Sequence, residues 1–229
     1  MRHSGPIFLI LAALFWGVSG GIGGMLLERG WDPYLIALVR GATGLLFMAG
    51  WLVVHPRRRT EFRCGSLWFW SALAGLGVAG NFTLYFISVE HASVSIAAPL
   101  MYCAPVFVFV ASFLLGLERP TLLKGIGIAL VLIGVGLLTG IHDLEAAEIG
   151  PMAIAAGLGA GAAYALFIFA FKFAAARGSA PAVLAIAFLV LVAVLLVPAG
   201  PDQAAAALTS SAWPLFLALG ILGAGVSFV

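Results

Sequence analysis

Apolar residues dominate long stretches of the chain, and charged or turn-forming residues separate these stretches at regular intervals. Each stretch is close to the length of about 20 residues that a helix needs to cross a bilayer. We therefore predict seven membrane-spanning helices and the beginning of an eighth. They cover residues 5–27, 34–54, 66–89, 93–115, 122–140, 150–175, 181–199 and the chain from 212 onward.

The composition indicates that the surrounding solvent is lipid. Of the 229 residues, 63% are hydrophobic and only 9% are charged, whereas soluble domains carry about 25% charged residues. So few charges cannot cover a water-facing surface around this much apolar material. The net charge of +2 gives no indication of nucleic-acid binding. Cys64 and Cys103 lie in different segments without metal-ligand spacing, so we expect neither a disulfide framework nor a zinc site.

The positions of the charged residues predict the orientation of the chain, because Lys and Arg collect in cytoplasmic loops. With a cytoplasmic N-terminus, most acidic residues are on the outer side, and only Arg29 among the basic residues is in an outer loop. The basic residues on the cytoplasmic side are then Arg2, Arg57, Arg58, Arg59, Arg63, Arg119, Lys124, Lys172 and Arg177. We expect a multi-pass protein of the inner (plasma) membrane with its N-terminus in the cytoplasm.

An internal repeat relates the two parts of the chain. A shift of 148 residues places Trp16 on Tyr164, Gly30 on Gly178, Pro33 on Pro181 and Ala37 on Ala185. One repeat unit holds an odd number of predicted helices, so the second copy enters the membrane from the opposite side. The prediction is an all-α transporter of ten helices in two inverted five-helix repeats. Residues 1–148 form the first repeat and 149–229 an incomplete second one, which lacks about 67 residues and ends in the eighth helix.

Several stretches follow the order and spacing of one known family. They are residues 13–17 (ALFWG), 38–41 (LVRG), 92–97 (ASVSIA), 104–107 (APVF) and 115–119 (LGLER), with Gly125, Gly134 and Gly136. On these residues the chain resembles the drug/metabolite transporter superfamily, in particular its EamA-type members and, among those, the YddG-type exporters of aromatic amino acids. The resemblance implies ten helices, both termini in the cytoplasm, and a central cavity that opens alternately to the two sides.

Aromatic residues near the middle of the predicted helices are candidates for substrate contact. Trp16 and Tyr164 occupy equivalent positions of the repeat, and Tyr102 lies near the middle of the fourth helix. Together with Tyr85 of the third helix they form a set that suits an amphipathic ligand. We predict that all four line the cavity. The alternative is that they pack between helices or anchor them at the membrane surface.

Polar residues inside a membrane either line a pathway or pair with one another. Asn81 lies four residues before Tyr85, so the two share one face of the third helix, which Ser88 continues. We predict that Asn81 also lines the cavity. The alternative for its amide is a hydrogen bond between helices.

Three further residues are candidates for gating or for shaping the helices. Pro99 and Pro105 lie within the fourth predicted helix, where each removes a backbone donor. They predict a kink, with a moving hinge as the functional alternative. Arg40 lies about two turns into the second helix. It either extends outward along its aliphatic stem or forms a gate ion pair with an outer acid such as Glu28.

The absence of other motifs limits the functional classes. No acidic residue lies in the middle of a predicted span, and we find no nucleophile with a paired base, no metal-ligand set and no glycine-rich phosphate loop. We therefore expect that the protein is not an enzyme and that it binds neither a cofactor nor a metal ion. The predicted function is export of neutral, in particular aromatic, amino acids or related metabolites by alternating access, by a monomer without a nucleic-acid partner. The alternatives are efflux of hydrophobic cations or drugs, and a non-transporting membrane scaffold or sensor.

Overall fold

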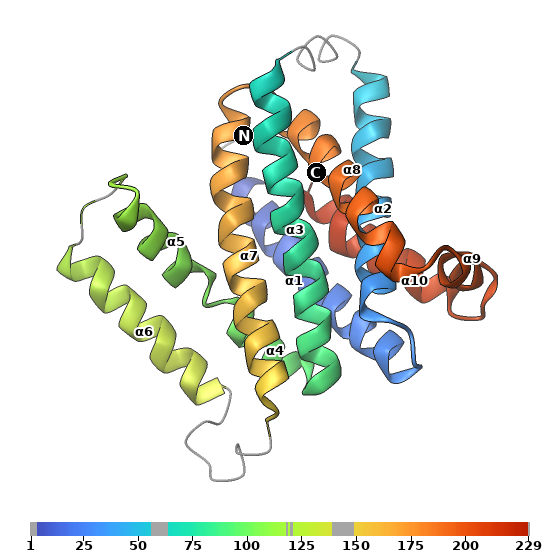
Figure 1. Cartoon of the computed structure of the whole chain (residues 1–229), viewed down its shortest axis with the longest axis horizontal. Helices are drawn as coiled ribbons and strands as arrows, with labels where there is room; N and C mark the ends of the chain where they lie inside the picture. The colour runs from blue at the N-terminus through green and yellow to red at the C-terminus, as the bar shows by residue number, and fades with distance from the viewer. Residues whose placement is uncertain (1–3, 56–63, 118, 120, 139–148, 229) are drawn as a thin grey trace.

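The computed structural model describes residues 4–55, 64–117, 119, 121–138 and 149–228, and the regular secondary structure within them is helical (Figure 1). The helices are α1 (Ser4–Glu28), α2 (Pro33–Val54), α3 (Gly65–His91), α4 (Val94–Met101), α5 (Ala104–Leu114), α6 (Leu122–Leu138), α7 (Pro151–Ala175), α8 (Ala180–Ala199), α9 (Pro201–Thr209) and α10 (Trp213–Gly220). A π-helical turn, η3 (Ile221–Gly225), and a 3-10 turn, η4 (Val226–Phe228), follow α10.

Six helical stretches of the described residues are long and apolar enough to cross a membrane. They are α1 from Ile10 onward, α2, α3, the stretch α4–α5, α7 and α8. The stretch from α10 to η4 passes the same test only as a pair with α9, from which it is bent by 106°. The described apolar stretch of α6, Leu122–Leu137, is shorter than a full span. The described helices therefore coincide with the predicted blocks, and the described residues of the fifth and eighth blocks do not pass the test for a span on their own.

α3 occupies the middle of the bundle and packs against α7 and α8, while α2 packs against α8 (Figure 1). Glycines allow this close approach. A Cβ at Gly75 would lie 2.6 Å from the carbonyl oxygen of Ala187 in α8, and a Cβ at Gly77 would lie 2.6 Å from the backbone nitrogen of Phe167 in α7. Helices in membranes associate largely through packing of this kind. The glycines of α3 thus bring the backbones of three helices together.

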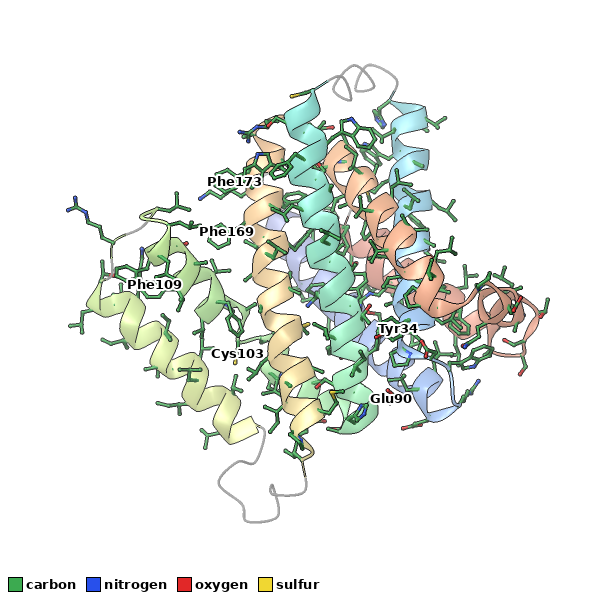
Figure 2. All side chains as sticks on the ribbon, in the orientation of Figure 1. Tyr34, Glu90, Cys103, Phe109, Phe169 and Phe173 are labelled. Carbon is green, nitrogen blue, oxygen red and sulfur yellow. The ribbon has the colours of Figure 1, made fainter. Side chains whose placement is uncertain are left out.

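α5 and α6 lie at one side of the bundle (Figure 1). Figure 2 shows Phe169 and Phe173 of α7 on the side of that helix where α5 and α6 lie. These two rings line an apolar groove of about 640 Å³ between α5 and α7. Phe109 lines a second groove, between α5 and α6. The groove between α5 and α7 is almost free of polar atoms, whereas Ser112 and Lys124 are among the residues that line the other one. Such largely apolar grooves suit a surface in contact with lipid chains.

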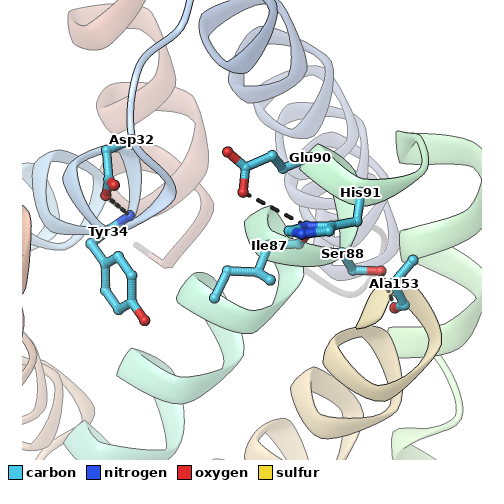
Figure 3. A network of polar contacts seen from close by, with 7 residues as sticks. All are labelled: Asp32, Tyr34, Ile87, Ser88, Glu90, His91 and Ala153. Atoms are coloured by element: carbon cyan, nitrogen blue, oxygen red, sulfur yellow. Dashed lines mark hydrogen bonds and ion pairs between the residues drawn. The ribbon is translucent and has the colours of Figure 1, made fainter. Parts of the chain in front are cut away.

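Two side-chain hydrogen bonds fix the register of α3 against α7. Asn81 Nδ2 donates to the carbonyl oxygen of Ala160 at 3.0 Å. Ser88 Oγ donates to the carbonyl oxygen of Ala153 at 2.7 Å, and Figure 3 shows these two residues. The same number of residues separates the two donors and the two acceptors, as expected of antiparallel helices in regular contact. In membrane proteins each such bond contributes about 0.6 kcal/mol on average.

The turn between α1 and α2 follows directly from its sequence. Gly30 has φ of +81°, and the amides of Gly30 and Trp31 bond the carbonyls of Leu27 and Leu26, which is a Schellman motif. The next helix begins after Asp32, whose Oδ1 accepts from the amide of Tyr34 at 2.7 Å (Figure 3). Pro33 then occupies the first helical position.

The fourth predicted helix is interrupted at Tyr102 and Cys103, between α4 and α5. Pro105 explains the interruption, because its missing N–H leaves the carbonyl of Met101 without its usual partner. α7 approaches that carbonyl through Gly161, where a Cβ would lie 3.0 Å from it. Pro99 is buried inside α4, and the helix continues through it. Whether the interruption acts as a hinge stays a prediction.

α9 is the one element of the described chain that lies outside every predicted block. Its nine residues include Asp202, Gln203 and four alanines, so the helix is too short and too polar to resemble a span. It lies at the edge of the bundle, where α8 ends (Figure 1). Only Ala207 of this helix is buried.

Candidate functional site

A pocket lies inside the bundle where α1, α2, α3 and α4 meet. It is lined by Trp16, Gly17, Gly20, Arg40, Asn81, Tyr85, Val94, Ala98, Met101 and Tyr102. Its volume is about 70 Å³, whereas pockets that hold small-molecule ligands usually measure about 300–1,000 Å³. The pocket is therefore narrow in this conformation, and its walls must separate before a ligand of amino-acid size can enter.

Four of the five predicted cavity residues lie in this pocket, although they come from three different helices. Trp16 comes from α1, Asn81 and Tyr85 come from α3, and Tyr102 lies at the interruption after α4. The fifth, Tyr164 of α7, does not line the pocket. Its ring contacts Trp16 edge to face, with 5.7 Å between the ring centroids. Tyr164 therefore supports the wall that Trp16 forms.

Glycines of α1 make room for the pocket. Apart from the backbone of α1 itself, no heavy atom lies within 4 Å of the position that a Cβ would take at Gly17. A Cβ at Gly20 would lie 2.7 Å from the hydroxyl oxygen of Tyr85, and one at Gly23 would overlap the ring of Phe86. The glycine-rich side of α1 thus receives the aromatic side chains of α3.

Asn81 combines the two roles that the sequence left as alternatives. It lines the pocket, and its Nδ2 is also the donor in the hydrogen bond to Ala160 of α7. Within the described residues, its Oδ1 takes part in no hydrogen bond. The amide therefore holds α3 to α7 and presents an acceptor oxygen beside the pocket. Ser88, on the same helix face, bonds to α7 and does not line the pocket.

The structure contradicts both interpretations of Arg40 that were given from the sequence. Its side chain is 4% exposed and does not extend outward to the membrane surface. Among the described residues no carboxylate lies within 4.0 Å of it, so it forms no ion pair with Glu28. Instead its Nε and Nη2 donate to the carbonyl oxygen of Gly223, at 3.2 and 3.1 Å. Sequence reasoning missed this partner because a backbone carbonyl 183 residues away has no side-chain signal.

Aromatic rings surround the Arg40 guanidinium. Its Cζ lies 4.1 Å from the ring centroid of Phe82 and 5.7 Å from that of Trp16. Contacts of this kind stabilise a cation by about 2 kcal/mol or more where water is excluded. Gly223 lies in the π-helical turn η3, and a Cβ there would lie 2.6 Å from Arg40 Nε. Phe82 and Gly223 are thus two further residues of the site that the sequence did not indicate.

The residues that line the pocket include no His, Cys, Asp or Glu. Within the described part of the chain, no group of three or more His, Cys, Asp and Glu side chains is close enough to hold a metal ion. All the groups that line the pocket are apolar, neutral polar or, in the case of Arg40, cationic. Such a site can bind and orient a ligand through apolar contact, hydrogen bonds and one positive charge.

The helical bundle, with its long apolar helices and a pocket between them, is that of a multi-pass membrane protein. The model of the EamA-like transporter family matches residues 3–140, which is more than half of the chain. The chain therefore belongs to the EamA-like transporter family, a family of membrane transporters and not of enzymes.

A solved structure described only as "Crystal structure of protein" has the same fold. It superposes with a TM-score of 0.64 at 19% sequence identity, over 97% of this chain and 75% of the other. At this identity the likeness concerns the fold alone. No curated protein matches the sequence significantly.

Proposed function

We propose that the protein exports neutral, in particular aromatic, amino acids or related metabolites by alternating access. The observation that carries this proposal is the pocket, where the rings of Trp16, Tyr85 and Tyr102 meet the polar groups of Asn81 and Arg40. The aromatic walls suit the apolar side chain of an amino-acid substrate, and the polar groups suit the amino and carboxylate groups of that substrate. The narrower assignment to the YddG-type exporters rests on the sequence resemblance.

The second part of the proposal is that the bundle is built from two inverted repeats of a ten-helix transporter. α3 begins at Gly65 and α10 at Trp213, which are related by the same shift of 148 residues as Pro33 and Pro181. α1 and α7 are equivalent under this shift, and they run in opposite directions in Figure 1. The packing of α3 on α7 also has its counterpart in the packing of α1 on α10, η3 and η4.

A two-fold axis through the bundle agrees with the contact between Trp16 and Tyr164. Residues that a two-fold axis relates lie against each other only when both are near the axis. The rings of these two repeat-related residues are 5.7 Å apart. Because Trp16 lines the pocket, the pocket lies close to the boundary between the proposed halves, where substrate sites of such transporters are built.

The ends of the helices support the proposed orientation. In Figure 1, the beginnings of α1, α3, α6 and α8 lie toward the same end of the bundle as the end of α7. Among the basic residues that the structure describes, Lys124, Lys172 and Arg177 belong to these helix ends. The basic group at 57–59 and Arg63 lies outside the described residues. This distribution supports a cytoplasmic N-terminus in an inner membrane.

The proposal is tested by efflux of radiolabelled phenylalanine from cells that express the protein. We expect Tyr102→Ala to reduce efflux about tenfold, because an aromatic contact of about 1.5 kcal/mol is lost from the pocket. Phe69→Ala is the matched control, since Phe69 is exposed on α3 away from the pocket. Equal efflux by wild type, Tyr102→Ala and cells without the protein, at equal membrane abundance, contradicts the proposal.

A further inference from the structure

Arg40 has more hydrogen-bond donors than the protein satisfies. A guanidinium carries five N–H groups, and the two described hydrogen bonds both end on one acceptor, the carbonyl oxygen of Gly223. Three N–H groups therefore have no acceptor within the described part of the chain. Arg40 also lines the pocket. The unused donors of a buried cation thus lie at the wall of the candidate site.

A second donor without a partner belongs to another residue that lines the pocket, Trp16. The indole Nε1 of Trp16 is fully buried and has no hydrogen-bond acceptor within the described residues. Buried N–H groups are nearly always paired, and each unpaired group costs about 1–3 kcal/mol. The ring of Trp16 lies against Arg40, with 5.7 Å between its centroid and Arg40 Cζ. Two side chains that contact each other and line the pocket therefore both carry donors without acceptors.

The charge of Arg40 indicates the kind of ligand that supplies the missing acceptors. An arginine in the membrane interior is costly unless it is paired, and none of the residues that line the pocket is acidic. The planar guanidinium matches a carboxylate with two parallel hydrogen bonds. A cationic ligand in this pocket would meet a fixed positive charge with no acid to offset it.

We propose that Arg40 and the indole N–H of Trp16 form a carboxylate-binding site, so that the protein selects monocarboxylates with an apolar side chain. This inference rests on the proposed function and specifies its substrate class. The amino group of a ligand meets only neutral acceptors in the pocket, such as the amide oxygen of Asn81 and the tyrosine hydroxyls. The carboxylate is therefore required for binding, whereas the amino group is dispensable.

Binding of four small probes to the purified protein in lipid nanodiscs tests this site. Phenylalanine and 3-phenylpropionate carry the carboxylate, whereas phenylalaninamide and 2-phenylethylamine lack it. We expect both carboxylates to bind wild type at least about tenfold more tightly than the other two probes, which corresponds to one charge-assisted hydrogen bond or more. Titration calorimetry measures the four affinities.

Variants separate the charge from the shape of the site. Arg40→Met is expected to abolish the preference for carboxylates, whereas Arg40→Lys keeps part of it, because lysine retains the charge without the planar pair of donors. Trp16→Phe keeps a ring but removes the indole N–H, and we expect a threefold to tenfold loss of carboxylate affinity. Trp31→Phe is the matched control, since Trp31 packs on Phe216 away from the pocket. Thermal unfolding of each ligand-free variant verifies that it is folded.

The outcomes distinguish this inference from the export proposal. The site is refuted if phenylalaninamide binds wild type as tightly as phenylalanine, if no carboxylate binds, or if Arg40→Met keeps the preference. Efflux measured in parallel tests export on its own. Carboxylates that bind through Arg40 but are not exported uphold the site and refute the export proposal. Equal export of phenylalanine and phenylalaninamide by wild type and Arg40→Met refutes the site and upholds export.

Discussion

The contact between α3 and α7 gives the most direct test of the packing, through the substitution Gly77→Ala. A Cβ at Gly77 would lie 2.6 Å from the backbone nitrogen and 2.9 Å from the Cα of Phe167. The shorter distance is about 0.8 Å inside the 3.4 Å at which ordinary contact begins. Both neighbours are backbone atoms, so a rotamer change cannot relieve the overlap and the helices have to move apart.

The expected loss of stability in Gly77→Ala follows from comparison with another Gly→Ala substitution in the same protein. Overpacking a core costs about 1–3 kcal/mol, and the backbone contact places Gly77→Ala at the upper end of this range. Replacing a helical glycine by alanine also gains about 1 kcal/mol of helix propensity. Gly50→Ala in α2 has the same gain in helix propensity without the overlap, because no atom beyond the backbone of α2 itself lies within 4 Å of the Cβ position. We expect the two variants to differ by about 2–3 kcal/mol.

Thermal unfolding in a mild detergent measures this difference. For a chain of this size, 2–3 kcal/mol corresponds to a melting temperature roughly 4–12 °C lower for Gly77→Ala than for Gly50→Ala. Efflux should fall as well, because Asn81 and Tyr85 lie on α3 just beyond Gly77 and line the pocket. Equal melting temperatures of the two variants would show that α3 and α7 do not approach each other as closely as described.

Three further predictions concern transport and topology. Gly17→Val should fill the narrow pocket and abolish efflux at normal membrane abundance, whereas Gly21→Val, on the same helix outside the pocket, should leave efflux unchanged. In a variant without Cys64, a membrane-impermeant thiol reagent should label Arg177→Cys only from the cytoplasm and Arg29→Cys only from outside; the reverse pattern refutes the orientation. Flux in proteoliposomes should follow the substrate gradient without a pH gradient, because no acidic residue lines the pocket; flux that stops when the pH gradient is collapsed refutes this.

The helices could be predicted from the sequence because their length is set by the bilayer and their ends by local signals. Gly30 and Asp32 terminate α1 and begin α2 through contacts with residues at most five positions away. The interruption near Tyr102 follows in the same way from the missing N–H of Pro105. α9 was not predicted because a short, alanine-rich helix has neither the length nor the apolar character of a span.

The sequence indicated pocket residues where they share a helix face or lie near the middle of a predicted helix, as Trp16 and Tyr102 do. Asn81 and Tyr85 are four residues apart, so their common direction follows from helix geometry. The environment of Arg40 depends instead on how α2, α3 and η3 pack together. Its acceptor is the carbonyl of Gly223, and its ring contact with Phe82 joins two helices. Neither contact has a sequence pattern, so the interpretation of Arg40 as a surface or ion-pair residue was wrong.

The pair of hydrogen bonds from Arg40 to Gly223 also has a thermodynamic consequence. The bonds join the first part of the chain to the second, and both end on one backbone oxygen. Hydrogen bonds to a charged group contribute about 1.5–3 kcal/mol each, and they are lost when donor and acceptor separate by more than about an ångström. Any conformation that shifts α2 relative to η3 gives up this energy, which changes its population by roughly one to two orders of magnitude or more. Arg40 therefore favours conformations in which α2 and η3 stay together, independently of any ligand.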